Sequence, residues 1–127
     1  MTRALADTSV FVAIEQGRPR RRAMPDEIVV SVVTVGELQL GVLLADSATR
    51  AVRLRTLSYV EATFEPLPID AATAREWARL VAHCRRTRRR VPLNDLWIAA
   101  TAIARDLAVL TQDADYDRIP GLRVLRL

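Results

Sequence analysis

The sequence predicts a three-layer α/β/α domain, in which helices cover both faces of a mostly parallel central sheet. Short apolar runs of strand length alternate along the chain with longer segments of helical periodicity, and strands that are separated by helices pair in parallel. The chain has 127 residues, of which 50% are hydrophobic, so it can bury a core without disulfides. We therefore expect residues 1–127 to form one domain.

The first part of the chain predicts a strand, a helix, a basic loop and a second strand. Arg3 to Asp7 is short and mostly apolar, as in a strand, and Thr8 to Gln16 has the composition of a helix. The segment GRPRRRAMPDE contains a glycine and two prolines, which indicates a loop. Ile28 to Val33 is rich in β-branched residues and predicts a buried strand.

Two helices and a short strand are expected in the middle of the chain. Thr34 to Ala45 predicts a helix, and Ser47 can cap another that runs from about Ala48 to Phe64. The segment EPLPI, which its two prolines hold extended, predicts a short strand.

The last part of the chain predicts two helices and two strands. Asp70 can cap a long amphipathic helix, whose apolar face would carry Trp77, Leu80, Val81 and Cys84. Asn94 or Asp95 begins a segment, LWIAATAIA, that is apolar on nearly all sides and predicts a central buried helix. The runs AVLT and LRVLRL predict the last two strands.

The basic residues favour a nucleic-acid partner. All 19 are arginine, none is lysine, and the formal net charge is +4. Arginine binds phosphate through two parallel hydrogen bonds, so clustered arginines suit an RNA or DNA backbone. The alternative is that the arginines form an ordinary solvated surface. Two clusters stand out: Arg18, Arg20, Arg21 and Arg22, and Arg85, Arg86, Arg88, Arg89 and Arg90.

The sequence also predicts a cytoplasmic protein without a disulfide or a membrane span. Cys84 is the only cysteine, and its neighbour His83 would point about 100° away from it on a helix, so neither is expected to be catalytic. No apolar stretch reaches the roughly 18 residues of a membrane helix, and the N-terminus does not resemble a signal peptide.

Acidic residues occur where an open α/β sheet gathers its functional side chains. Asp7 and Asp113 follow strand-like runs, and Asp115 comes two residues later. Glu37 and Asp95 lie at or near the start of helix-like runs. These positions meet in a crevice at the carboxyl ends of parallel strands. We therefore expect the carboxylates to converge and to bind a metal ion.

Each acid also has a purely structural explanation. Asp7 could cap the first helix, and Thr34 with Glu37 fits the capping-box pattern. Asp95 could occupy a first turn because the helix dipole favours negative charge there, and the acids of TQDADYD could belong to a turn. None of these explanations predicts that four separate elements place an acid at the same sheet edge. The coincidence favours the metal site.

The segments ADTSV, TVGEL, NDLWIAATA and TQDADYDRIPGLRVL occur in this order over nearly the whole chain. Together they resemble PIN-domain ribonucleases, and the chain is similar in size to the VapC toxins of bacterial toxin–antitoxin pairs. The resemblance implies an acidic pocket that holds Mg²⁺ or Mn²⁺, formed by Asp7, Glu37, Asp95 and Asp113, with nearby hydroxyls from Thr8, Ser9 and Thr111. It leaves open which of Asp113, Asp115 and Asp117 supplies the fourth acid, so Asp115 is also a metal-ligand candidate.

The resemblance further implies an RNA substrate, a homodimer and a small antitoxin of the VapB type that docks across the pocket. Cleavage of RNA by such a toxin would inhibit translation or growth. A carboxylate pocket alone would repel an RNA phosphate, whereas a divalent cation reverses that charge, activates a water for attack and offsets charge on the leaving oxygen. The sequence leaves open whether one or two ions bind. Neutral oxygens near the same edge would come from Asn94 and Thr111.

Several other classes of phosphate-handling protein do not fit the sequence. Phosphoacceptor receiver domains and haloacid dehalogenase phosphatases use a lysine, which this chain lacks, and Ser9 stands where such phosphatases have a second aspartate. The Gly-Lys-Ser/Thr of P-loop proteins is also missing. The alternatives that remain are a housekeeping RNA-processing PIN nuclease, a DNA flap nuclease, for which the chain is short, and a non-catalytic RNA-binding or interaction domain.

The segment LQLGVLLA after Glu37 predicts a helix that is apolar on two sides. Helical spacing places Leu40, Leu43 and Leu44 together, with Leu38 and Val42 on another side. Because core packing accounts for only one side, we expect the other to contribute to a dimer or antitoxin surface.

Overall fold

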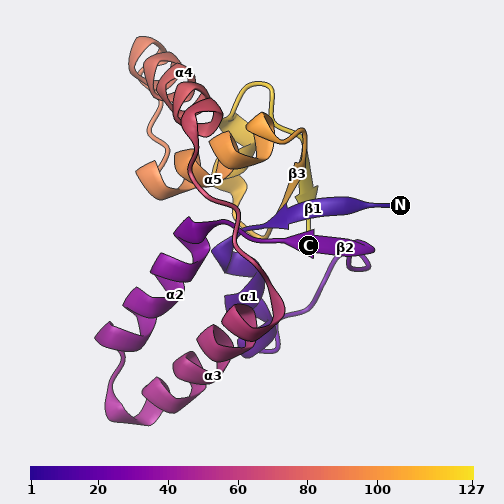
Figure 1. The fold of residues 1–127 in the computed structure, drawn as a ribbon, viewed down its shortest axis with the longest axis vertical. Coiled ribbons are helices and arrows are strands. Elements are labelled where there is room, and N and C mark those ends of the chain that lie inside the picture. Colours follow the sequence, from indigo (N-terminus) through magenta and orange to yellow (C-terminus); the bar gives the residue numbers. More distant parts are fainter.

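A computed structural model describes all 127 residues, and its centre is a single sheet of four parallel strands (Figure 1). The strand order is β2-β1-β3-β4. The bounds of the strands are Arg3–Ala6 for β1, Glu27–Val29 for β2, Ala108–Thr111 for β3 and Val124–Arg126 for β4. Helices lie on both faces of this sheet, which confirms the three-layer α/β/α prediction.

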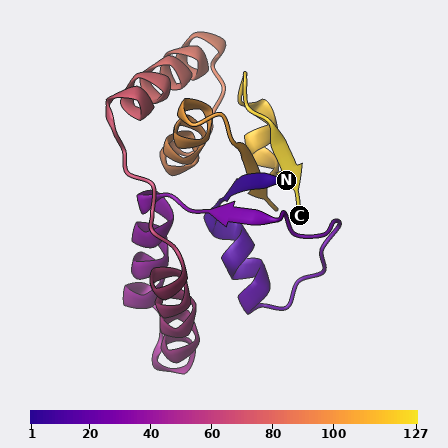
Figure 2. The same cartoon turned by 45° about the vertical axis from the view of Figure 1, so that its right-hand side comes forward.

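Five α-helices and one 3₁₀ helix connect the strands. Their bounds are Thr8–Glu15 for α1, Val32–Leu44 for α2, Ser47–Thr63 for α3, Ala71–Thr87 for α4, Leu93–Ala104 for α5 and Ala114–Arg118 for the 3₁₀ helix η1. Figures 1 and 2 show α2 and α3 as an antiparallel pair that extends away from the sheet. The helices α4 and α5 pack together beyond the opposite face.

The two faces of the sheet carry alternate residues of the same strands. Leu5 and Val109 pack into a core with α4 and α5. Ala4, Ala6 and Leu110 pack into a second core with α1, α2 and α3. Successive side chains of a strand point to opposite faces, so strands that are buried on both sides need the continuous apolar runs that the sequence shows.

The helix α5 lies in the centre of the first core, as its composition predicted. Ile98, Ala99 and Ala102 are all at most 1% exposed, and the small alanines let α5 lie close to its neighbours. Trp77 of α4 stacks on Trp97 of α5 with ring centroids 4.5 Å apart. Trp77 is therefore half-buried at the junction of the two helices, beside the core rather than inside it.

The predicted strand from Ile28 to Val33 is too long at its C-terminal end. Strand β2 ends at Val29, and α2 already begins at Val32 because the Ser31 side chain accepts a hydrogen bond from the Thr34 N–H. A local side-chain cap thus outweighs the β-branched composition. The expected strand at EPLPI is only a single bridge between Ser31 and Leu67, outside the main sheet.

Two helix starts also differ from the prediction. Asp46 rather than Ser47 caps α3, since its carboxylate accepts from the Thr49 N–H at 2.9 Å. Helix α5 begins at Leu93, directly after Pro92, so neither Asn94 nor Asp95 is its cap. Asp70 caps α4 as expected. None of the helices has both the length and the apolar composition that a bilayer span requires.

Candidate metal centre

The strand order places the ends of β1 and β3 side by side. From β1 the chain continues through α1 to β2 on one side, whereas β3 and β4 lie on the other side of β1. Such a reversal opens a crevice at the carboxyl ends of the central strands. Asp7 follows β1 directly, and its N–H donates to the Leu110 carbonyl of β3 at 3.0 Å. The first predicted acid therefore lies at the expected point.

Asp7 is buried and held by two hydroxyls. It is 3% exposed, its Oδ1 accepts from Ser9 Oγ at 2.6 Å, and its Oδ2 accepts from Thr111 Oγ1 at 3.0 Å. Burial raises the pKa of Asp7 from 3.8 to about 6, with smaller upward effects of Asp113 and Glu37, against the lowering effect of the two hydroxyls. Its side chain makes no capping bond to α1, so the structural explanation for this residue is wrong.

Asp95 brings a second carboxylate from the first turn of α5. Its Oδ1 accepts from the Tyr116 hydroxyl at 3.4 Å, and its Oδ2 is buried without any hydrogen-bond partner. Burial is the main cause that raises the pKa of Asp95 to about 7, followed by the charges of Asp113, Asp7, Glu37 and Asp115. Buried polar atoms are nearly always paired. An unpaired carboxylate oxygen surrounded by other acids therefore fits a position at which a cation could bind.

Glu37 points to the site from the first half of α2. Its Oε1 accepts from Thr8 Oγ1 at 2.6 Å, and its Oε2 accepts from Asn94 Nδ2 at 3.5 Å. The capping-box explanation is wrong, because Ser31 rather than Thr34 caps this helix. Glu37 thus links α1, α2 and α5 through its side chain.

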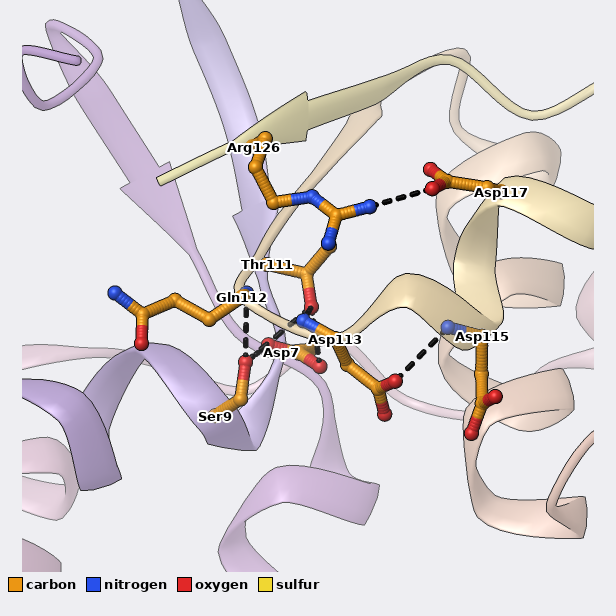
Figure 3. Close-up of polar contacts among 8 residues, drawn as sticks. All are labelled: Asp7, Ser9, Thr111, Gln112, Asp113, Asp115, Asp117 and Arg126. Carbon is orange, nitrogen blue, oxygen red and sulfur yellow. Dashed lines mark hydrogen bonds and ion pairs between the residues drawn. The ribbon is translucent and has the colours of Figure 1, made fainter. Parts of the chain in front are cut away.

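The acids after β3 point in two directions. Asp113 caps η1 by accepting from the Asp115 N–H at 2.9 Å, and both side chains lie on the side of Asp95. Carboxylate oxygens of Asp95, Asp113 and Asp115 all lie within 4.8 Å of one another. Asp117 points away and pairs with Arg126 at 2.6 Å, as Figure 3 shows.

The donor set fits a hard divalent cation. It consists of carboxylate oxygens with neutral hydroxyls around them, and it contains no histidine or cysteine. Mg²⁺ and Mn²⁺ prefer such oxygen ligands. The raised pKa values of Asp7 and Asp95 and the unpaired Oδ2 of Asp95 are what is expected where a positive charge completes a site.

Comparison with known proteins identifies the family of this chain. The PIN domain family matches residues 4–122. The chain is 50% identical over 127 residues to ribonuclease VapC4 of Mycobacterium tuberculosis, covering 98% of this chain and 97% of the relative. It is also 50% identical over 117 residues to ribonuclease VapC5 of the same organism, covering 91% and 86%. The chain belongs to the PIN-domain family.

Solved structures place this PIN domain close to VapC proteins. The toxin–antitoxin structure VapBC-5 of Mycobacterium tuberculosis contains a chain with 43% identity, a TM-score of 0.87 and full coverage of both chains. VapBC2 of Rickettsia felis, bound to a DNA fragment, has 20% identity with a TM-score of 0.82 over 99% of each chain, which supports the fold. The VapC resemblance drawn from the sequence is confirmed.

Two residues of this PIN-domain pocket were not expected from the sequence. Tyr116 is fully buried and donates to Asp95, and the Gln112 N–H donates to Ser9 Oγ at 3.0 Å. The available signal for Tyr116 was its place among three acids, where a large aromatic has no reason to lie in a solvated turn. Gln112 contacts Ser9 through its backbone N–H, so its residue type gave no signal of this contact.

Proposed function

We propose that this chain is a metal-dependent endoribonuclease that acts in the cytoplasm as the toxin of a toxin–antitoxin pair. The observation that carries the proposal is the convergence of acids from β1, α2, α5 and the segment after β3 around the unpaired Oδ2 of Asp95. The relatives named ribonuclease VapC and the neighbours named VapBC support RNA as the substrate and a toxin role. Cleavage of cellular RNA would then inhibit translation or growth.

The proposed metal ligands are Asp7 and Asp95 directly, with Glu37 and Asp113 bound directly or through water. Asp115 is the fifth candidate, because its carboxylate lies with those of Asp95 and Asp113. Mg²⁺ or Mn²⁺ in this position would neutralise the phosphate, lower the pKa of a bound water and offset charge on the leaving oxygen. Asp117 is not proposed as a ligand, since it pairs with Arg126.

The hydroxyls have a positioning role in this proposal. Ser9 and Thr111 fix both oxygens of Asp7, and Thr8 fixes Glu37. A carboxylate that is held in one rotamer binds a cation without first losing conformational freedom. The phosphate therefore meets a site whose acids are already oriented.

Cleavage of RNA by the purified protein tests the proposal. We expect Mg²⁺ or Mn²⁺ to activate cleavage, EDTA to stop it, and Asp95→Asn to abolish it, because the variant keeps the shape but loses the charge. Asp106→Asn is the matched control: this side chain is 99% exposed, its φ of 53° suits asparagine, and it lies at the other end of the strands. Full activity of a folded Asp95→Asn variant would contradict the assignment.

The proposed antitoxin partner has a candidate contact surface on α2. Leu40, Leu43 and Leu44 are 52%, 66% and 77% exposed, whereas Leu38 and Val42 of the same helix are buried in the core. The predicted division of this helix into an inner and an outer apolar side is thus confirmed. An exposed apolar stripe of this kind suits a helix of a partner protein.

Substitution on this stripe tests the partner. Leu43→Arg should weaken binding of the co-expressed VapB-type antitoxin at least tenfold, whereas Ile69→Arg, which is exposed outside α2, should not. Light scattering of the same variants tests the proposed homodimer. Loss of self-association with unchanged antitoxin affinity would assign the stripe to the dimer instead.

A further inference from the structure

We propose that a cavity beside the acidic pocket binds a phosphate of the RNA strand adjacent to the phosphate that is cut. The cavity measures about 280 Å³, and it is lined by Arg18, Pro19, Arg21, Gln112, Arg126 and Leu127. Its volume is roughly nine times that of a water molecule in the liquid, which is enough for a phosphate with part of its ribose. The inference rests on the ribonuclease proposal, because it names how the same substrate is held.

The arginine loop is held in place where it leaves α1. Gly17 has a φ of 65°, its N–H donates to the Ile14 carbonyl at 3.2 Å, and the Arg18 N–H donates to the Ala13 carbonyl at 2.9 Å. This pair of bonds with a left-handed glycine is the Schellman motif, which fixes the direction of the chain after a helix. Pro19 then limits the backbone further.

A second contact ties the loop to the acidic pocket. Gln112 Nε2 donates to the Pro19 carbonyl at 3.3 Å, while the Gln112 N–H donates to Ser9 Oγ. Ser9 Oγ in turn donates to Asp7. One residue thus contacts both the arginine loop and the hydroxyl that holds a proposed metal ligand, so the cavity and the pocket are neighbours.

Strand β4 contributes the third arginine of the cavity lining. The parallel register pairs Arg126 with Thr111, whose hydroxyl donates to Asp7. Asp117 holds the Arg126 guanidinium at 2.6 Å, and Figure 3 shows both beside the acidic pocket. Asp117, left open as a metal ligand by the sequence, here orients an arginine.

The charges around the cavity favour an anion. Arg18 and Arg21 have no ion-pair partner, whereas Arg126 is paired with Asp117. The two free guanidinium groups offer donors to a ligand with several acceptor oxygens, whereas the Gln112 amide already donates to the carbonyls of Pro19 and Leu127. A phosphodiester next to the scissile one meets this description, since an RNA strand that enters the acidic pocket carries such a group on either side.

The second arginine cluster lacks this relation to the pocket. The cavity beside Arg85, Arg88, Arg89 and Arg90 has an apolar floor that includes Val81, Cys84, Val91, Leu93 and Leu96. Arg89 donates to the carbonyl of Arg118, at the C-terminal end of η1. No hydrogen bond connects the cluster to an acid of the pocket, so we assign the phosphate contact to the Arg18 loop.

RNA binding without metal tests this assignment separately from cleavage. The probe is a fluorescein-labelled single-stranded 12-nucleotide RNA of mixed sequence, titrated in EDTA at several salt concentrations. The double variant Arg18→Gln with Arg21→Gln should bind about tenfold more weakly, because charge-assisted bonds to one phosphate are lost. The slope of log K against log salt should become shallower by about 0.7, the value for one phosphate contact of a single strand.

The matched control is Arg22→Gln with Arg75→Gln. It removes the same charge, takes one residue from the same loop, and leaves the lining of the cavity intact. We expect its affinity and salt slope to stay within twofold of the wild type. Equal weakening in both double variants would mean that only net charge matters, and it would overturn the assignment.

Two further measurements complete the test. In Mg²⁺, the Arg18 and Arg21 variant should have a higher KM for RNA with a kcat within a few-fold of the wild type, and an unchanged KM would overturn the phosphate site. A wild type that cuts no RNA while it binds as described would instead overturn the ribonuclease proposal. If an acidic peptide bound tightly and RNA affinity did not respond to the substitutions, the cavity would belong to a protein partner.

Discussion

Replacement of Asp7 by asparagine should stabilise the metal-free protein near pH 8 while it abolishes RNA cleavage. The side chain is 3% exposed, and its pKa is raised from 3.8 to about 6, mainly by burial. At pH 8 the wild type must therefore keep a buried negative charge that water would have solvated in the unfolded chain. Asparagine has the same shape without that charge.

The size of the effect follows from the pKa. The difference between 3.8 and about 6 corresponds to about 3 kcal/mol at 1.36 kcal/mol for each pH unit. Part of this stabilisation is lost in the variant, because the asparagine amide cannot accept the hydrogen bonds from both Ser9 and Thr111. One such bond contributes about 1 kcal/mol. The net gain is about 2 kcal/mol, or roughly 6–8 °C in melting temperature for a chain of this length.

The stability that Asp7→Asn gains over the wild type must depend on pH in a defined direction. The folded pKa of Asp7 lies above its unfolded value, so the wild type loses stability as the pH rises from about 4 to about 6, while the variant has no such loss at this position. The difference in free energy of unfolding between the two proteins should therefore be largest above pH 7 and shrink towards pH 4. Urea denaturation in EDTA at pH 4.5, 6 and 8 measures it.

Added metal should make the wild type more stable than the Asp7→Asn variant. Mg²⁺ binds the folded wild type and should raise its melting temperature, whereas Asp7→Asn should respond far less, because a ligand has been neutralised. An Asp7→Asn variant that is less stable than the wild type at pH 8, with a difference that does not change with pH, would refute the claim that a crowded buried charge destabilises this site.

Other substitutions probe the supports of the site. Gly17→Ala should lower the free energy of unfolding by about 1 kcal/mol in urea denaturation, because φ is 65° while no atom lies within 4 Å of the new Cβ. Leu80→Ala, at a fully buried position against α5, should lower it by about 2–5 kcal/mol in the same measurement. Tyr116→Phe removes the hydroxyl that donates to Asp95, and calorimetric titration with Mn²⁺ should show weaker metal binding with an unchanged number of sites.

The layers of the fold were predictable because the composition of the strands distinguishes them from the helices. The runs around Leu5 and Val109 are apolar on both faces, and only a sheet covered on both sides needs such runs. The start of α2 was not predictable in the same way. Val32 and Val33 have strand composition, but Ser31 caps the helix before them, and a single side-chain bond decided the boundary.

The candidate site was predictable as a set and less so in its details. Asp7, Glu37 and Asp95 converge as expected, because the ends of parallel strands and the starts of the following helices lie at one edge of the sheet. The direction of Asp117 could not be read from the sequence. It depends on the turn of η1 and on an arginine in a strand nine residues later, and neither is encoded in the DADYD pattern.

The hydroxyls around Asp7 connect the stability of the fold to the proposed chemistry. Without them, burial and the neighbouring acids would raise the pKa of Asp7 further. Ser9 and Thr111 lower the pKa by donating to the carboxylate, so the charge that a cation requires is retained in a buried position. Ser9→Ala should therefore shift the pH dependence of metal binding to higher pH, with little change in binding well above pH 8. An unchanged midpoint in Mn²⁺ titrations across pH 5–8 would show that this hydroxyl has no such role.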